Sequence, residues 1–193
     1  MPPADESAAD SLVPGVLTEI EAWLAEHAAA VSGRLPPGAP EASIKELEVA
    51  TSVALPAGYR AFLLRHDGGM PWRSYDLLSV DEVLTAWKSM TAMQEQGTFK
   101  DAEVSTDDGR VAETWWSRGW IPIARDSGGN LVCIDMAPGP KGRAGQIIRW
   151  DTVDGPVPTE HASFDTWLQA FRDDLSARKY ALTEDEILEF KES

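Results

Sequence analysis

The stretch from residue 120 to residue 135 most constrains what this chain can fold into. Two β-rich runs, Trp120–Ala124 and Leu131–Asp135, flank a short segment that contains two glycines and an asparagine. Because glycine and asparagine tolerate a positive φ, this segment predicts a tight β-hairpin. A third β-rich run, Gln146–Trp150, follows a loop rich in glycine and proline. Three strands so close in sequence indicate an antiparallel meander.

Helical patterns lie on both sides of these strands. Apolar residues recur every three or four positions in segments that begin near Val16, Ile44, Tyr59, Val80 and Phe164. An amphipathic helix buries its apolar stripe against another element, and here a sheet is available for it. The pattern therefore predicts an α+β fold, with a central, mainly antiparallel sheet flanked by helices.

Capping signatures predict where several helices begin. Ser or Thr followed three residues later by Glu forms a capping box, and this pattern starts at Ser43, Ser79 and Thr183. Thr183 would open a short helix near the C-terminus. Residues 151–161 contain two prolines and predict a loop.

The domain organisation is simple. Residues 1–14 are rich in Pro, Ala, Asp, Glu and Ser, which is typical of a flexible leader. Residues 15–176 carry the periodic segments and predict one domain, and residues 177–193 form a C-terminal tail with the short helix.

The charge of the chain limits its function. Its 193 residues carry a formal net charge of −15, which argues against a direct nucleic-acid binder because phosphate binding needs clustered Lys and Arg. An acid excess steers basic protein partners toward a surface. The alternative is that the charge only aids solubility.

The cellular location of the protein is predicted from the targeting and membrane signals that the sequence lacks. The N-terminus is acidic and lacks an apolar signal core, and no apolar run approaches the roughly 20 residues of a membrane span. We expect a cytoplasmic protein. Its one cysteine, Cys133, lies in a predicted strand and is expected to be a small buried hydrophobe.

No catalytic or metal-binding constellation is evident, and no cofactor is expected. The three histidines are scattered and none forms a His-x-x-x-His pair. The Gly/Pro loop at 138–145 lacks the Gly-Lys-Ser/Thr that opens a helix in a phosphate loop. Asp126 and Asp135 lie across the predicted hairpin and, with His161, leave a small hydrolase as the weakest alternative. Ser127 lacks the strand-to-helix elbow of a nucleophile.

Aromatic and acidic residues outside the predicted sheet are the candidates for partner binding. Exposed tryptophans anchor many interfaces, and residues 97–114 form a long acidic segment. The candidate binding residues are Trp72, Asp107, Asp108, Trp115 and Trp116. The alternative for the three tryptophans is burial in the core.

The order of motifs resembles the SUKH superfamily, which is named partly for the fungal Smi/Knr cell-wall assembly regulators. The matching motifs, in chain order, are Leu55-Pro56-x-x-Tyr59-Arg60-x-Phe62-Leu63, Asp67-Gly68-Gly69, Trp120–Ala124 with its Gly-Gly-Asn turn, Leu131–Asp135, Gln146-Ile147-Ile148 and Ser163-Phe164-x-x-Trp167-Leu168. The resemblance covers roughly residues 15–175.

The resemblance implies an α+β binding protein without catalytic residues. Bacterial members are inferred to be immunity proteins that neutralise toxins, often nucleases, so the leading hypothesis is an immunity protein that binds a basic toxin domain. The alternative is a regulatory scaffold or adaptor of the cell-wall regulator type. The leader, the tail and the 97–114 segment extend beyond the common pattern, and partner choice is expected to differ there.

Overall fold

The computed structural model of the protein describes residues 11–104 and 109–191. Its helices, in chain order, are α1 (Val13–His27), α2 (Ala29–Arg34), α3 (Glu41–Thr51), α4 (Ala57–Arg65), α5 (Val80–Glu95) and α6 (Phe164–Ser176). Its strands are β1 (Pro71–Trp72), β2 (Tyr75–Leu77), β3 (Trp120–Asp126), β4 (Leu131–Asp135), β5 (Gln146–Asp151), β6 (Gly155–Pro158), β7 (Tyr180–Leu182) and β8 (Leu188–Phe190). None of the described helices is long and apolar enough to cross a bilayer.

The main sheet is a six-stranded antiparallel meander in the order β1-β2-β3-β4-β5-β6. The predicted hairpin is present: Ile121 of β3 pairs with Ile134 of β4, and the register shifts at a bulge between Pro122 and Ala124. β4 pairs in turn with β5. The α+β class and the three predicted strands are therefore confirmed.

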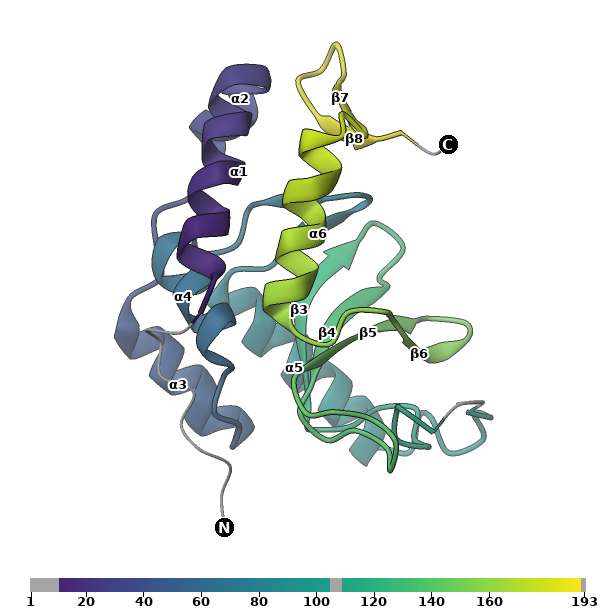
Figure 1. Cartoon of the computed structure of the whole chain (residues 1–193). Coiled ribbons are helices and arrows are strands. Elements are labelled where there is room, and N and C mark those ends of the chain that lie inside the picture. The colour runs from purple at the N-terminus through teal and green to yellow at the C-terminus, as the bar shows by residue number, and fades with distance from the viewer. Residues whose placement is uncertain (1–10, 105–108, 192–193) are drawn as a thin grey trace.

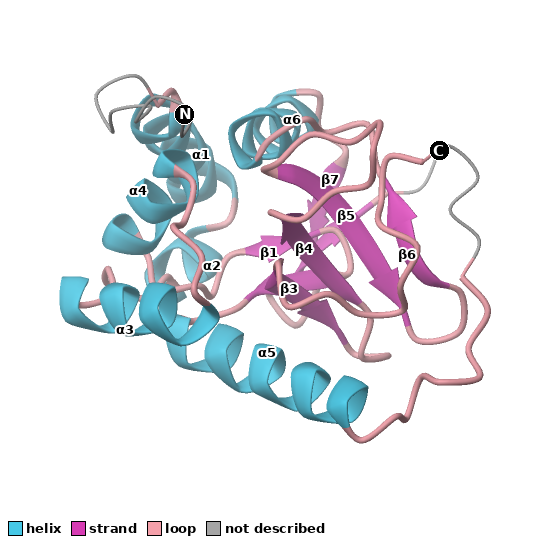
Figure 2. Ribbon diagram, turned by 90° about the horizontal axis from the view of Figure 1, so that it is seen from below, coloured by secondary structure: helices cyan, strands magenta, loops and turns pink. Residues whose placement is uncertain are grey.

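Helices cover both faces of this sheet. Alternate residues of a strand point to opposite faces, so Ile148 and Trp150 of β5 lie on one face and Arg149 on the other. Helix α5 contacts β3 and α6 contacts β5, and Figure 2 shows α5 and α6 on opposite sides of the strands. We call these the α5 face and the α6 face.

The α5 face is a closed aromatic core. The ring of Trp116 meets Trp120 edge-to-face at 5.7 Å, and Trp115 meets Trp150 in the same way at 6.3 Å. Trp150 Nε1 donates to the Trp115 carbonyl at 2.7 Å. Cys133 is fully buried in this region as predicted, and burial raises the pKa of its thiol.

The N-terminal helices extend the core beside the sheet. Helix α1 packs against α2, α4 and α6, and Figure 1 shows α1 running alongside α6. Tyr59 and Phe62 of α4 contact the ring of Phe164 at the start of α6, at 5.1 and 5.6 Å. The apolar stripes predicted from the sequence are buried here.

The capping predictions have mixed outcomes. The Ser79 capping box with Glu82 is formed, and Ser163 caps α6 with Thr166 in the same way. The Ser43 box is wrong because α3 begins earlier, at Glu41, after Pro40 at the N-cap. Proline fixes φ near the helical value, so it can set the start of a helix without a side-chain cap.

Two further predictions are corrected by the structure. The segment expected to be a loop contains β6, whose two prolines are tolerated because it is an edge strand. The tail forms the β7–β8 hairpin instead of a helix. Its turn is closed by the Thr183 hydroxyl, which accepts from the Ile187 N–H at 3.1 Å. Glu186 takes a positive φ of 58° there, which is incompatible with a continuing helix.

Candidate protein-binding groove

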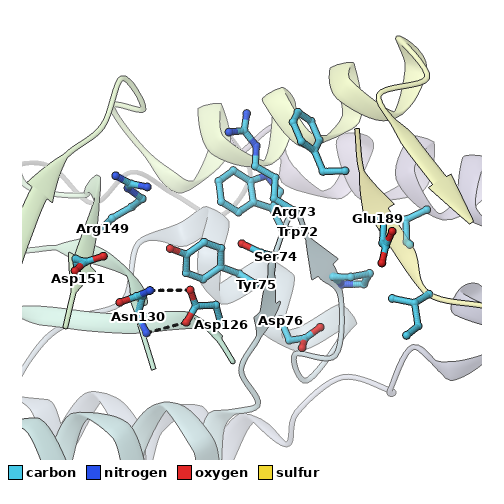
Figure 3. Close-up of a pocket in the computed structure, with 14 residues that line it drawn as sticks. Trp72, Arg73, Ser74, Tyr75, Asp76, Asp126, Asn130, Arg149, Asp151 and Glu189 are labelled. Carbon is cyan, nitrogen blue, oxygen red and sulfur yellow. Dashed lines mark hydrogen bonds between the residues drawn. The ribbon is translucent and has the colours of Figure 1, made fainter. Parts of the chain in front are cut away.

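A groove with a volume of about 710 Å³ lies on the α6 face of the described part of the chain. Its residues come from the β1–β2 hairpin, from the ends of the central strands and from β8 of the tail. Figure 3 shows Tyr75 near the middle, with Arg149 and Asp151 on one side and Glu189 on the other. The groove therefore lies between the main sheet and the C-terminal hairpin.

A hydrogen-bonded turn builds one end of the groove. Asp126 Oδ1 accepts from the N–H groups of Gly128 and Asn130, each at 2.9 Å. Asn130 Nδ2 donates to Asp126 Oδ2 at 2.9 Å, and its Oδ1 accepts from the Thr152 N–H at 3.0 Å. The side chain of Asn130 thus ties the β3–β4 turn to the β5–β6 turn, which fixes the position of the Asp126 carboxylate.

Tyr75 forms the floor beside this turn. It pairs with Asp126 across β2 and β3, so the two side chains share the α6 face. Burial raises the pKa of the Tyr75 hydroxyl, and the charges of Asp126 and Asp151 raise it further. Backbone N–H groups of Val153 and Asp154 lower the pKa of Asp151. These shifts favour a charged Asp151 carboxylate beside a neutral phenol.

Arg73 fastens the tail to the groove. Its backbone N–H donates to the Tyr180 hydroxyl at 3.0 Å. Its guanidinium carbon lies 4.6 Å from the Phe190 ring centroid and 5.0 Å from that of Trp72, in cation–π geometry. The same side chain lies 3.6 Å from Asp174 of α6. These contacts hold β8 as one wall of the groove.

The ionisable groups that line the groove are predominantly acidic. They are the acids Asp76, Asp126, Asp151 and Glu189 and the bases Arg73 and Arg149. Arg73 faces Asp174, which offsets part of its charge. Exposed Ile187 and half-buried Phe190 add apolar surface along β8. An acidic groove with an apolar wall suits a peptide segment that carries both basic and apolar residues.

A smaller cavity of about 190 Å³ adjoins the groove and shares Trp72, Arg73 and Arg149 with it. It lies next to His161, whose pKa burial lowers. The Trp72 and Trp167 rings lie 4.7 Å apart between the sheet and α6. This cavity marks where α6 stops covering the sheet and the open groove begins.

Comparison with known sequences identifies the family. The SMI1 / KNR4 family (SUKH-1) matches residues 38–170. The chain belongs to this family. The resemblance predicted from the motifs is confirmed, and the groove residues from the sheet all lie inside the SMI1/KNR4 match. The wall formed by β8 lies beyond it.

Relatives of this SMI1/KNR4 chain include named fungal regulators. The "Cell wall biosynthesis/cell cycle regulator smi1" of Schizosaccharomyces pombe is 29% identical over 147 residues, which cover 67% of this chain and 29% of that protein. A "Glucan synthesis regulatory protein" of Neurospora crassa is 26% identical over 217 residues, with 90% and 41% covered. The "Cell wall assembly regulator SMI1" of Saccharomyces cerevisiae is 24% identical over 209 residues, with 86% and 41% covered.

The chain spans less than half the length of these SMI1/KNR4 relatives. All three are named as regulators and none as an enzyme. At the family level this fits a non-enzymatic protein. It also fits the adaptor alternative better than the immunity-protein hypothesis drawn from the sequence.

The structure places the predicted binding residues in different environments. Trp72 and Trp116 are buried, with exposed fractions of 6% and 2%, and the edge of Trp72 lines the groove. Trp115 is half-buried against Trp150. Asp107 and Asp108 lie outside the described residues. The described part of the SMI1/KNR4 domain therefore does not gather the predicted residues into one surface.

The two carboxylates of the hydrolase alternative, Asp126 and Asp135, lie far apart in the structure. Asp135 pairs with Trp120 at the start of β3, whereas Asp126 ends that strand. Six residues of strand separate the two positions by roughly 20 Å. Asp135 is fully buried, accepting from Gln146 Nε2 and the Ala137 N–H at 2.9 Å each. Within the described ranges no cluster of three His, Cys, Asp or Glu could hold a metal ion.

The sequence contained a partial signal for the groove. Arg149 and Asp151 are polar residues at alternate positions of an otherwise apolar strand, which indicates that this face is open at its end. Nothing local to residues 71–76 indicates that residues 187–190 lie opposite them. That half of the groove depends on the tertiary packing of Arg73 with Tyr180 and Phe190.

Proposed function

We propose that this SMI1/KNR4 chain is a non-enzymatic regulatory domain that binds a basic protein partner in the groove on its α6 face. The observation that carries the proposal is the acid excess of the groove. Four carboxylates and two guanidiniums line it; Asp76 pairs with Arg125 and so projects toward the α5 face, which leaves three carboxylates on the groove side. The wider chain adds to this field with its net charge of −15. Charge complementarity of this kind raises the association rate and selects the partner.

The regulatory part of the proposal comes from the relatives. The fungal proteins that match this chain are named for cell wall assembly and glucan synthesis. We infer that this chain acts as a scaffold or adaptor of that type.

Toxin neutralisation is the second candidate, and the acidic groove is the observation that favours it. A nuclease toxin needs a basic surface to bind nucleic acid, and an acidic groove suits such a surface. The two candidates share one binding mode and differ in the identity of the partner. One dominant toxin-like protein would indicate neutralisation, whereas several host regulatory proteins would indicate a scaffold.

A capture experiment from the native host tests the binding mode. The test variant is Asp126→Asn with Asp151→Asn, because asparagine keeps one oxygen for the backbone N–H groups of each turn. Asp126→Asn gives up the hydrogen bond from Asn130 Nδ2, so the fold of the variant is checked by its thermal unfolding. The matched control is Glu26→Gln with Glu46→Gln, which removes two exposed charges from α1 and α3. The captured partner is then titrated against each purified protein at low and high salt.

We expect the groove variant to weaken binding about tenfold at low salt, since each charge contributes roughly 1 kcal/mol or less across a solvated contact. The control is expected to bind like the wild-type protein. High salt should reduce the wild-type affinity by screening. Equal binding by both variants would remove the groove as the site.

A further inference from the structure

One wall of the groove is an unpaired strand edge. In the β7–β8 hairpin, the Thr183 N–H donates to the Ile187 carbonyl and the Lys191 N–H donates to the Lys179 carbonyl. Antiparallel strands alternate hydrogen-bonded and non-hydrogen-bonded pairs. The pair of Leu182 with Leu188 follows Thr183 with Ile187 in the register and is therefore non-hydrogen-bonded.

The same alternation applies to the other end of β8, where Tyr180 pairs with Phe190. The backbone N–H and C=O groups of Leu188 and Phe190 consequently point away from β7. Among the described residues, neither of these backbones hydrogen-bonds to another segment. Leu188 and Phe190 both line the groove, where Leu188 is 2% exposed and Phe190 is half-buried, so Phe190 is the more accessible of the two edge positions.

The edges of the main sheet are protected in a way that β8 is not. β1 carries Pro71, and β6 carries Pro156 and Pro158. A proline in an edge strand cannot donate to an added strand, which is one way proteins prevent unwanted pairing. β8 has no proline and can accept a further strand. β7, the other edge of the hairpin, also lacks proline but does not line the groove.

The groove also determines which strand fits. Alternate residues of an added strand point to the same face, so basic residues at every second position would face the carboxylates of Asp126 and Asp151. Residues of the other set would face away from these carboxylates. Glu189 of β8 adds a third negative charge near the strand edge.

We propose that the groove binds an extended, basic segment of the partner as an additional strand on β8. This proposal rests on the proposed function and names the form in which the partner binds. Backbone hydrogen bonds to Leu188 and Phe190 would provide affinity, and the carboxylates of the groove would select basic side chains. This division of roles is general for peptides that bind by strand addition.

The test uses the full chain and a fluorescent probe peptide of alternating arginine and valine, Arg-Val-Arg-Val-Arg-Val, with blocked ends. Two further peptides have the same charge, one N-methylated at each arginine and the other at each valine. An added strand directs one set of N–H groups at β8 and the other set outward. Fluorescence anisotropy gives the three affinities, and NMR hydrogen exchange follows the amides of Leu188 and Phe190.

We expect one methylated peptide to lose at least about tenfold in affinity and the other to bind like the parent peptide. The amides of Leu188 and Phe190 should exchange at least about tenfold more slowly in the complex. The Glu189 amide, which already faces β7, serves as the internal control and should change less.

Two outcomes would overturn the proposal. If both methylated peptides bind equally and the two amides stay unprotected, the partner segment is not an added strand, while an acidic binding groove still stands. If the parent peptide shows no binding at about 1 mM, strand addition on β8 is excluded. The capture experiment with the groove variant decides the proposed function separately.

Discussion

The two faces of the central sheet are built from the same strands and differ in what covers them. The α5 face is closed by α5 and by the aromatic segment before β3, with Trp116 and Trp120 fully buried. The α6 face is covered by α6 only in part. Beyond Trp72 and Trp167 it opens into the groove, where exposed Arg149 lies beside the buried ring of Tyr75.

This difference shows that buried tryptophans mark the closed parts of both faces of the sheet, Trp116 and Trp120 on the α5 face and Trp72 and Trp167 under α6. The large aromatic rings fill the space between the sheet and its covering segments, where each stabilises the fold through buried area. Polar residues at alternate strand positions mark the open face instead. A binding surface in this fold is therefore better sought among strand charges than among the tryptophans.

The largest expected effect is on the closed face. Trp116→Ala should lower the free energy of unfolding by about 3–5 kcal/mol, the usual cost of removing a buried aromatic side chain. The variant also loses the hydrogen bond from Trp116 Nε1 to the Thr91 hydroxyl, which is 3.3 Å long. Urea denaturation with a fixed m-value measures the change.

The matched comparison is Trp115→Ala. Trp115 is half-buried, and the hydrogen bond that it accepts from Trp150 uses its backbone carbonyl, which the variant keeps. The expected loss is smaller, about 1–2 kcal/mol. Loss of partner binding by Trp116→Ala with an unchanged free energy of unfolding would contradict the assignment of the α5 face to the core.

Most of the fold was predictable because its signals are local. The β-rich run Leu131–Asp135, the turn glycines and the capping box at Ser79 each depend on a few adjacent residues. The tail shows where this fails. The Thr183 pattern is the same as at Ser79, but at Thr183 it closes a hairpin turn because Tyr180 packs on Phe171 of α6 and on Phe190.

The candidate site was predictable only in part, because burial depends on distant contacts. Trp72 and Trp116 are chemically suitable as anchors, yet Trp167 and Trp120 enclose them. The groove joins segments that are 107 positions apart at the hydrogen bond from Arg73 to Tyr180. The sequence had no local pattern that could indicate this pairing.

The two faces also hold carboxylates whose pKa values shift in opposite directions. Burial raises the pKa of Asp135 on the α5 face, although hydrogen bonds from Gln146 and Ala137 oppose the rise. Backbone N–H groups of Val153 and Asp154 lower the pKa of Asp151 on the α6 face. An NMR titration of the side-chain carboxyls should find Asp135 above and Asp151 below the usual range for aspartate.

The two shifts have opposite consequences for stability. The stabilising contribution of Asp151 is present above its unfolded-state pKa and is lost as the pH falls through its lower folded-state value. Asp135 is protonated more readily in the folded state, so its contribution decreases as the pH rises from its unfolded-state pKa through its folded-state pKa. Asp135→Asn should abolish this part of the pH dependence. A lowered pKa for Asp135 would show that its hydrogen bonds outweigh burial.

The smallest expected effect comes from replacing one exposed arginine on each face of the sheet. Arg149→Gln removes a positive charge from the groove, so the affinity for the Arg-Val probe peptide should rise about two- to fivefold. The free energy of unfolding should change by less than about 0.5 kcal/mol because Arg149 is exposed.

Arg125→Gln is the control, because Arg125 is exposed and pairs with Leu131 on the α5 face. It changes the net charge of the chain equally but should leave the affinity nearly unchanged. An equal rise for both variants would mean that overall charge, and not the α6 face, attracts the peptide.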